Sequence, residues 1–561
     1  MKFKKSVTQY EIIEFEFEKN EDISYIDITN PVGKTFRILP FESVAVDYKY
    51  DDEGFESILS DNKKYQKCRY SPSTVGEYRI KAIFNNSVVQ DGVFKVSKGT
   101  NHGYIKVSEK DKRYFCYSDG TSFFPIGINM AFPGTFGISN GDEFGLSDKF
   151  KYIGMKQYER WFRECSKNGV NLARVWLGHE YFNPETEQSG VYDYKQFAKI
   201  DKLLELSEKY NIKLKLTLEQ FRTMDYERKA DTLSQSDDIF RKFNRVIYKG
   251  ERTCKSVREW LDDEFWQNEW LNKINEIGKR YAYNPNIFAI ELWNEMNCIG
   301  NVTAWNKKMA ECVRNIFPNH MIINSLGSYD CKNVERYYSD FCWHLFDFKQ
   351  LHSYLDQGAK LDAPTKSPID ALQYCINAQK ENNMPFFVAE TGAVNNRHSG
   401  PFKYYPYDHR GIIFADCVYT PVFLGCAGVG NIWHWDERYV EFKNLYPMYK
   451  PLIKLFDGVS FDSENFVSKD YSNDQAYIFI LEGNNYSLGY IRNKSDNWKN
   501  VLRDLNNPTP ISFDFNTDRN LGKLEKINIW EDDVTITTNF ESIKICNLHY
   551  GVFVKFQSNA G

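Results

Sequence analysis

Apolar and acidic residues alternate near the start of the chain. Residues 10–18 read Tyr-Glu-Ile-Ile-Glu-Phe-Glu-Phe-Glu, and this period of two is typical of a half-exposed strand. Turn clusters at 30–33 and 71–73 then separate further short strands, such as residues 78–84. We therefore expect residues 1–100 to form an immunoglobulin-like β-sandwich without a catalytic constellation of its own.

The pattern changes near Gly103, where buried apolar strands begin to alternate with long amphipathic helices. The predicted strands are 123–129, 172–177, 212–218, 287–293, 321–325, 348–352, 386–390 and 430–434. The predicted helices are 155–168, 196–210, 260–281, 304–317, 371–382, 412–424 and 446–456. Eight strands alternating with helices predict a (β/α)8 barrel over residues 101–457. A doubly wound open sheet is the alternative, although no glycine-rich phosphate loop follows the first strand.

Short strands return after about Gly458, for example at 475–481, 487–492 and 551–556. Polar turns separate them, so residues 458–561 are expected to form a second small β-sandwich. The predicted fold class is therefore α/β: a TIM barrel flanked by two small β-sandwich domains.

Composition excludes several classes of partner. The formal net charge is −5 and no basic block is present, which argues against nucleic acid or an anionic membrane surface as a partner. The sequence contains no run of eighteen or more apolar residues, which is the length that a membrane-spanning helix needs. The 12 cysteines include no C-x-x-C pair, so we expect free thiols rather than a zinc ribbon. The aromatic content of 16% fits sandwich cores and, more weakly, a sugar-binding cleft.

The first residues, Met1 to Lys5, resemble the basic start of a signal peptide, but the next fifteen are charged and alternating. We therefore expect a cytoplasmic protein, or a secreted one if a leader was trimmed.

Two glutamates mark the ends of predicted strands. The fourth strand ends in Asn294-Glu295, and the seventh ends in Ala389-Glu390-Thr391-Gly392. A barrel places its active site at the carboxyl ends of its strands, so Glu295 and Glu390 should face each other across the mouth. Such a pair can cleave a glycosidic bond, because one carboxylic acid protonates the leaving oxygen while the other carboxylate attacks the anomeric carbon.

Arg174 lies inside a strand otherwise built for burial, Leu172 to Leu177. A buried guanidinium needs a carboxylate partner, so Arg174 either assists the site or only braces the barrel. Glu291 shares the strand parity of Glu295 and would be desolvated inside the barrel, so we interpret it as a partner of Arg174 rather than as the acid.

Other strand ends offer candidate ligands. The sixth strand places His352 and Tyr354 at the same rim, and the eighth supplies Trp433 and Trp435, whose indoles could form the floor of a sugar subsite. The ends of the first and third strands supply two possible hydroxyl ligands, Asn129 and Gln220.

Together these segments resemble clan A of the glycoside hydrolases, and within it the family-five cellulases and mannanases. The residues that carry the resemblance are Trp293-Asn-Glu295, Ala389-Glu-Thr-Gly392, Arg174, His352-Ser-Tyr354, Trp433-His-Trp435, Phe124-Pro-Ile-Gly-Ile-Asn129 and Gly190-Val-Tyr-Asp193. The resemblance implies a retaining mechanism without metal or other cofactor.

The same resemblance implies a role for individual residues. Glu295 would be the general acid/base and Glu390 the nucleophile, kept ionised by Arg174 and Tyr354. Asn294 would bind the sugar 2-hydroxyl and His352 would line the site. Trp433 or Trp435 would stack on the sugar that bears the scissile bond.

The predicted function is retaining hydrolysis of β-linked oligosaccharides, with glucan and mannan both open as substrates. Long connections after the first strand (131–152) and the third (222–257) could wall off a pocket and favour exo action. The alternatives are an endo-β-1,4-glucanase or mannanase, a transglycosylase with the same residues, and a non-catalytic carbohydrate-binding barrel. The oligomeric state is left open.

Overall fold

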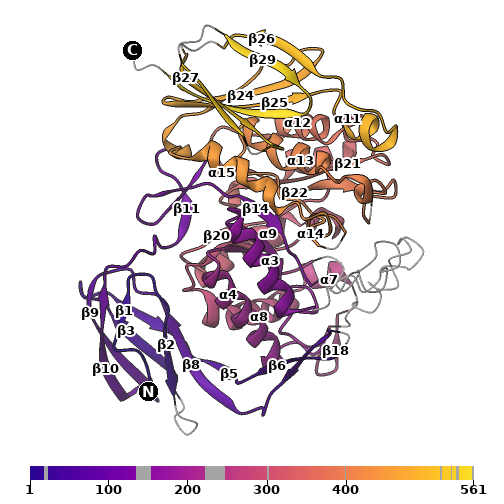
Figure 1. Ribbon diagram of the computed structural model, residues 1–561. Helices are drawn as coiled ribbons and strands as arrows, with labels where there is room; N and C mark the ends of the chain where they lie inside the picture. The colour runs from indigo at the N-terminus through magenta and orange to yellow at the C-terminus, as the bar shows by residue number, and fades with distance from the viewer. Residues whose placement is uncertain are drawn as a thin grey trace.

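The structure is a computed structural model, and it describes the chain apart from residues 18–22, 53, 134–152, 221–246, 255, 300–301, 399, 437, 518–520, 532, 539–541 and 559–561. A barrel occupies the middle of the molecule, and two β-rich regions lie at opposite ends of it (Figure 1). The long connections expected to wall off a pocket lie mostly outside the described residues. Among the described helices, none is both long and apolar enough to cross a membrane.

A two-stranded sheet, β6 Asp47–Tyr50 with β7 Glu56–Leu59, and two larger sheets make up the N-terminal region. One larger sheet has the strand order β1-β10-β9-β3-β4 and the other β2-β8-β5. Their bounds are β1 Ser6–Thr8, β2 Ile13–Phe17, β3 Tyr25–Thr29, β4 Thr35–Ile38, β5 Phe41–Val44, β8 Lys64–Tyr70, β9 Gly76–Phe84 and β10 Ser87–Ser97. The alternation in β2 buries Ile13, Phe15 and Phe17 while its glutamates stay partly exposed. These side chains share one apolar core with Ile28 and Phe94 of the other larger sheet.

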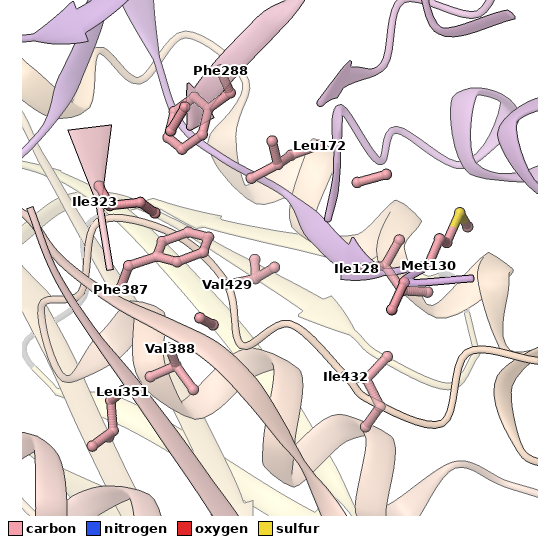
Figure 2. Packing of buried hydrophobic residues seen from close by; sticks show 14 of the residues in the cluster. Ile128, Met130, Leu172, Phe288, Ile323, Leu351, Phe387, Val388, Val429 and Ile432 are labelled. Carbon is pink, nitrogen blue, oxygen red and sulfur yellow. The ribbon is translucent and has the colours of Figure 1, made fainter. Parts of the chain in front are cut away.

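Parallel strands form the barrel, as the alternating pattern predicts. They are β14 Gly127–Asn129, β15 Leu172–Trp176, β16 Lys213–Thr217, β19 Ile287–Glu291, β20 Met321–Ile323, β21 Lys349–Asp356 and β22 Phe386–Val394. Strands β14 to β20 pair in chain order, and β21 pairs with β22. Apolar side chains from these strands, including Leu172, Phe288 and Phe387, point toward one another inside the barrel (Figure 2).

The eighth barrel position differs from the predicted strand 430–434. Only an isolated bridge forms there, between Ile432 and Thr391. Glycine at 430 lets the chain pack closely against helix α13 (Ile412–Phe423), since a Cβ on Gly430 would clash with the carbonyl oxygen of Cys417. The segment still closes the barrel, because Asn431 N donates to Val388 O (3.0 Å) and Asn129 N donates to Ile432 O (3.2 Å).

Helices cover the outside of the barrel close to where the sequence predicts them. They are α3 Met155–Lys167, α4 Tyr194–Lys209, α7 Val257–Asp262, α8 Glu264–Tyr281, α9 Thr303–Ile316, α12 Pro368–Gln379, α13 Ile412–Phe423 and α15 Lys450–Phe456, with α10 Lys332–Asp340 unforeseen. The predicted helix 260–281 is divided, because Asp263 has extended backbone and its side chain accepts a hydrogen bond from Phe265 N at the start of α8.

The C-terminal region contains a six-stranded sheet, β23-β24-β25-β30-β27-β28, and the two-stranded sheet β26-β29. The bounds are β23 Val467–Asp470, β24 Ala476–Glu482, β25 Tyr486–Asn493, β26 Ile511–Phe515, β27 Leu521–Asn528, β28 Val534–Thr538, β29 Ile543–Leu548 and β30 Gly551–Ser558. Every residue of α13 is buried. This helix lies between barrel and sheet, where Tyr419 packs edge-on against Phe553 (4.9 Å between ring centroids) and Asp416 accepts a hydrogen bond from Arg492 (2.8 Å).

One buried histidine at the amino end of β20 makes stability depend on pH. Nε2 of His320 lies 2.9 Å from Asn284 O, and burial lowers the pKa of His320 to about 4. Between pH 6.5 and 4, His320 is protonated in the unfolded chain but neutral in the folded chain. The free energy of unfolding therefore falls as the pH falls. We expect a loss of about 3 kcal/mol from this residue.

Urea denaturation followed by tryptophan fluorescence at pH 7, 6, 5 and 4.5 measures this loss. His320→Gln cannot titrate, so its free energy of unfolding should fall less steeply than that of the wild type. Equal slopes for the two proteins would show that His320 does not carry the effect.

Candidate active site

Two glutamates meet at the carboxyl ends of the barrel strands. Glu295 follows β19 by four residues, and Glu390 lies in β22 opposite His352 of β21. One carboxylate oxygen of Glu295, one of Glu390 and one ring nitrogen of His352 all lie within 4.8 Å of one another. The Glu390 side chain is 4% exposed and that of Glu295 is 20% exposed. The arrangement therefore has one enclosed carboxylate and one that reaches solvent.

Arg174 joins the enclosed carboxylate to the barrel interior. Its Nε and Nη2 donate to the two oxygens of Glu291, at 2.8 Å each, and its Nη1 contacts Oε1 of Glu390. Burial opposes the charged guanidinium, but these two carboxylates outweigh it and raise the pKa of Arg174. Arg174 thus braces the barrel through Glu291 and also contacts the candidate nucleophile, Glu390. The structural and the site-supporting roles expected from the sequence are therefore both present.

Glu291 occupies the supporting position that its strand parity indicates. It is fully buried, and it also accepts hydrogen bonds from Thr217 (2.9 Å) and Gln350 (3.0 Å). Although burial acts to raise its pKa, the charges of Arg174 and Lys215 prevail and hold the pKa of Glu291 well below its usual value. A permanently ionised carboxylate with this many donors cannot serve as a proton donor at neutral pH.

Tyr354 and His352 both touch the glutamate pair. Tyr354 Oη donates to Oε2 of Glu390 (2.6 Å), and burial raises the pKa of Tyr354 well above its usual value. His352 Nδ1 lies 3.0 Å from Glu295 Oε1 and 3.4 Å from Glu390 Oε2. Burial lowers the pKa of His352 to about 4, so a neutral imidazole stands between the two carboxyl groups.

The backbone at Glu295 adopts an unusual conformation. Its φ is 55°, in the left-handed region that residues other than glycine rarely enter. Ser325, just beyond β20, holds it there, because Glu295 N donates to Ser325 Oγ (3.0 Å) and Met296 N donates to Ser325 O (2.9 Å). Such strain persists where surrounding structure enforces it, and it concentrates at functional sites.

The remaining predicted ligands divide into two groups. Asn294 is buried beside the pair, and its Oδ1 accepts a hydrogen bond from Arg174 Nη2 (2.7 Å), which orients its amide. Trp433 is half-buried and lies beside Trp176, with 5.2 Å between ring centroids. Gln220 is buried and bridges to Asn294. Their contacts with sugar remain predictions.

Trp435 and Asn129 lie deeper, and the Asn129 Oδ1 accepts a hydrogen bond from Arg174 Nη1 (3.4 Å). Trp435 is completely buried and packs edge-on against Trp161 and Trp433, so it presents no surface on which a sugar could stack. The Asn129 amide donates to the carbonyl oxygens of Ala389 (3.0 Å) and Asn431 (3.0 Å). This side chain closes the barrel beside the irregular eighth segment, and it is fully buried.

Sequence reasoning missed Lys215, which extends the charged cluster below Glu291. Its signal is the same as that of Arg174: a cation at an inward position of the buried strand β16. Two groups of described side chains have the spacing of metal ligands: Glu295, His352 and Glu390, and also Asp330, Asp356 and His398. In the first group the contact of Arg174 with Glu390 already supplies a cation.

Residues 137–409 match the sequence family described as Cellulase (glycosyl hydrolase family 5). The central region of the chain is similar to glycosyl hydrolase family 5. This match confirms the resemblance noted from the sequence and supports a retaining glycoside hydrolase.

Curated proteins similar to this chain include two named mannan endo-1,4-β-mannosidases. The chain is 24% identical to mannan endo-1,4-β-mannosidase 4 of Solanum lycopersicum over 46% of its own length and 72% of that protein's. It is 27% identical to mannan endo-1,4-β-mannosidase F of Aspergillus clavatus, over 43% of its own length and 56% of the relative's. The chain therefore spans about half to three quarters of these two relatives.

A solved structure of a family 5 glycoside hydrolase from Bacteroides vulgatus has a TM-score of 0.51, with 13% identity, over 82% of this chain and 94% of that one. At this identity the likeness supports the barrel fold alone.

Proposed function

We propose that this protein hydrolyses β-1,4-mannosidic bonds by double displacement, with net retention at the anomeric carbon. The observation that carries the mechanism is the closeness of the glutamates, whose nearest oxygens lie within 4.8 Å. Carboxyl groups roughly 5–5.5 Å apart are typical of retaining enzymes, whereas inverting enzymes need about 6.5–9.5 Å to admit a water.

The contacts assign a different task to each glutamate. Glu390 is enclosed and held by Arg174 and Tyr354, which orient its carboxylate for attack on the anomeric carbon. Glu295 reaches solvent and can pass its proton to the leaving oxygen as the glycosidic bond breaks. The resulting ester between sugar and Glu390 is then attacked by water, whose proton returns to Glu295.

The choice of mannan rests on the relatives, since those reported above are named mannan endo-1,4-β-mannosidases. The sequence leaves glucan open as well. Exo action remains a prediction, because most of the connections that motivate it lie outside the described residues. The intracellular location is likewise a prediction.

Digestion of mannohexaose, with cellohexaose in parallel, tests the proposal. We expect cleavage of mannohexaose and slower cleavage of cellohexaose, with the β-anomer of the product appearing first by proton NMR. Release of mannose alone supports exo action, and mixed lengths support endo action. Initial formation of the α-anomer, or faster cleavage of cellohexaose, would overturn the mechanism or the substrate respectively.

A further inference from the structure

A second buried cation lies beneath the Arg174–Glu291 pair. Lys215 is fully buried in β16, next to Arg174 in the strand register. Its Nζ donates to Gln350 Oε1 (2.8 Å) and lies 3.7 Å from Glu291 Oε2. Gln350 in turn donates to Glu291 Oε1 (3.0 Å), so Lys215 supports Glu291 directly and through one amide.

The charge of Lys215 compensates the negative charge of the buried carboxylates, which an apolar side chain of the same size could not do. The connected buried cluster contains Arg174, Glu291, Glu390 and Lys215, which sum to zero when all four are ionised. Without the lysine charge, two enclosed carboxylates would share a single guanidinium. Uncompensated charge inside a protein is costly, and it would weaken the hold of Arg174 on Glu390.

The surroundings make the lysine charge sensitive to its neighbours. The Lys215 ammonium interacts electrostatically with Glu291, Arg174 and Glu390, and its charge also acts on His352. The Phe387 ring centroid lies 5.4 Å from its Nζ. Burial lowers the pKa of Lys215 to about 7, although Glu291 and Glu390 favour the charged form. The ammonium therefore depends on these carboxylates as they depend on it.

We propose that Lys215 is a positioning residue for the nucleophile: it balances the charge of Glu291 and so keeps Arg174 directed at Glu390. The inference rests on the proposed role of Glu390 as the nucleophile. Lys215 is completely buried, and its influence passes through Glu291 and Arg174.

The strand itself offers a matched control. Lys213 is also buried in β16 and points to the same side, but it is the first residue of the strand, and its Nζ donates to Pro285 O (3.2 Å) and Asn286 Oδ1 (3.0 Å). Lys215→Met and Lys213→Met each remove one buried ammonium of the same shape. Only the first removes a charge from the nucleophile's cluster.

Kinetics on mannohexaose across pH 4–9 test the proposal. We expect Lys215→Met to lower kcat about 10- to 100-fold with little change in KM, and to shift the acid limb of kcat/KM to higher pH. Lys213→Met should keep kcat within about threefold of the wild type and leave the profile unchanged. A folded Lys215→Met protein with wild-type kcat and pH profile would overturn the inference.

A double-variant cycle covers the case in which Lys215→Met does not fold. Because Lys215 acts through Glu291, adding Lys215→Met to Glu291→Gln should change kcat by less than about threefold. A further large loss in that background contradicts the inference. If Glu390→Ala itself keeps full activity, the proposed function fails instead, and the two failures are thereby distinguished.

Discussion

Replacing Glu390 with alanine is expected to lower kcat on mannohexaose by about 10⁴-fold or more, since the attacking carboxylate is gone. The loss should appear in kcat rather than in KM, because the enclosed Glu390 contributes to the reacting centre more than to the grip on the oligosaccharide. Stopped assays with reducing-sugar detection measure it, and circular dichroism establishes that the variant is folded.

A small anion distinguishes loss of a nucleophile from general damage. The vacated space in Glu390→Ala is lined by Arg174 and Tyr354, which both contact the carboxylate in the intact protein. Azide should bind there and attack the anomeric carbon as the bond to the leaving group breaks, giving an α-glycosyl azide from an aryl β-mannoside. Glu390→Gln fills the same space and should show no rescue. A β-configured azide product, or no rescue of either variant, would count against Glu390 as the nucleophile.

The barrel was predictable from the sequence because most of its strands are short apolar runs that alternate with segments of helical period. The eighth segment departs from a strand at a position where the linear pattern carries no warning. Gly430 lies close against Cys417 of α13, and that contact depends on how a distant helix packs.

Part of the site could be predicted because a charged residue within an apolar strand is unusual. Arg174 stands out by this criterion. Lys215 carries the same anomaly, but lysines alternate with leucines from Lys213 to Thr217, and that alternation imitates a half-exposed strand. All five residues are in fact buried. The two sides of this strand face the barrel interior and the surrounding helices, and neither side faces solvent.

Trp433 and Trp435 show the limit of strand parity. Because they are two residues apart, their side chains should lie on the same side of a strand. By the sequence pattern, both are therefore candidates for the floor of a sugar subsite. The chain turns instead, with Trp435 N donating to Trp433 O (2.7 Å), and it carries Trp435 into the core against Trp161. Only the half-buried Trp433 remains near the surface.

Replacing Glu295 with alanine is expected to have an effect that depends on the leaving group. An oligosaccharide alkoxide needs a proton to depart, so hydrolysis of mannohexaose should fall by about 10²- to 10⁴-fold. A 2,4-dinitrophenolate departs without one, so formation of the glycosyl ester from 2,4-dinitrophenyl β-mannoside should continue at nearly the wild-type rate. Its hydrolysis should then be slow, because no general base activates the water.

A burst of dinitrophenolate equal to the enzyme concentration, followed by a slow steady state, is the expected measurement. Mass spectrometry should find the sugar attached to the peptide that contains Glu390. The control is Glu390→Ala, which cannot form the ester and should show no burst. If Glu295→Ala slows both substrates equally and gives no burst, Glu295 does not act as the general acid, and the left-handed backbone that presents it would need another explanation.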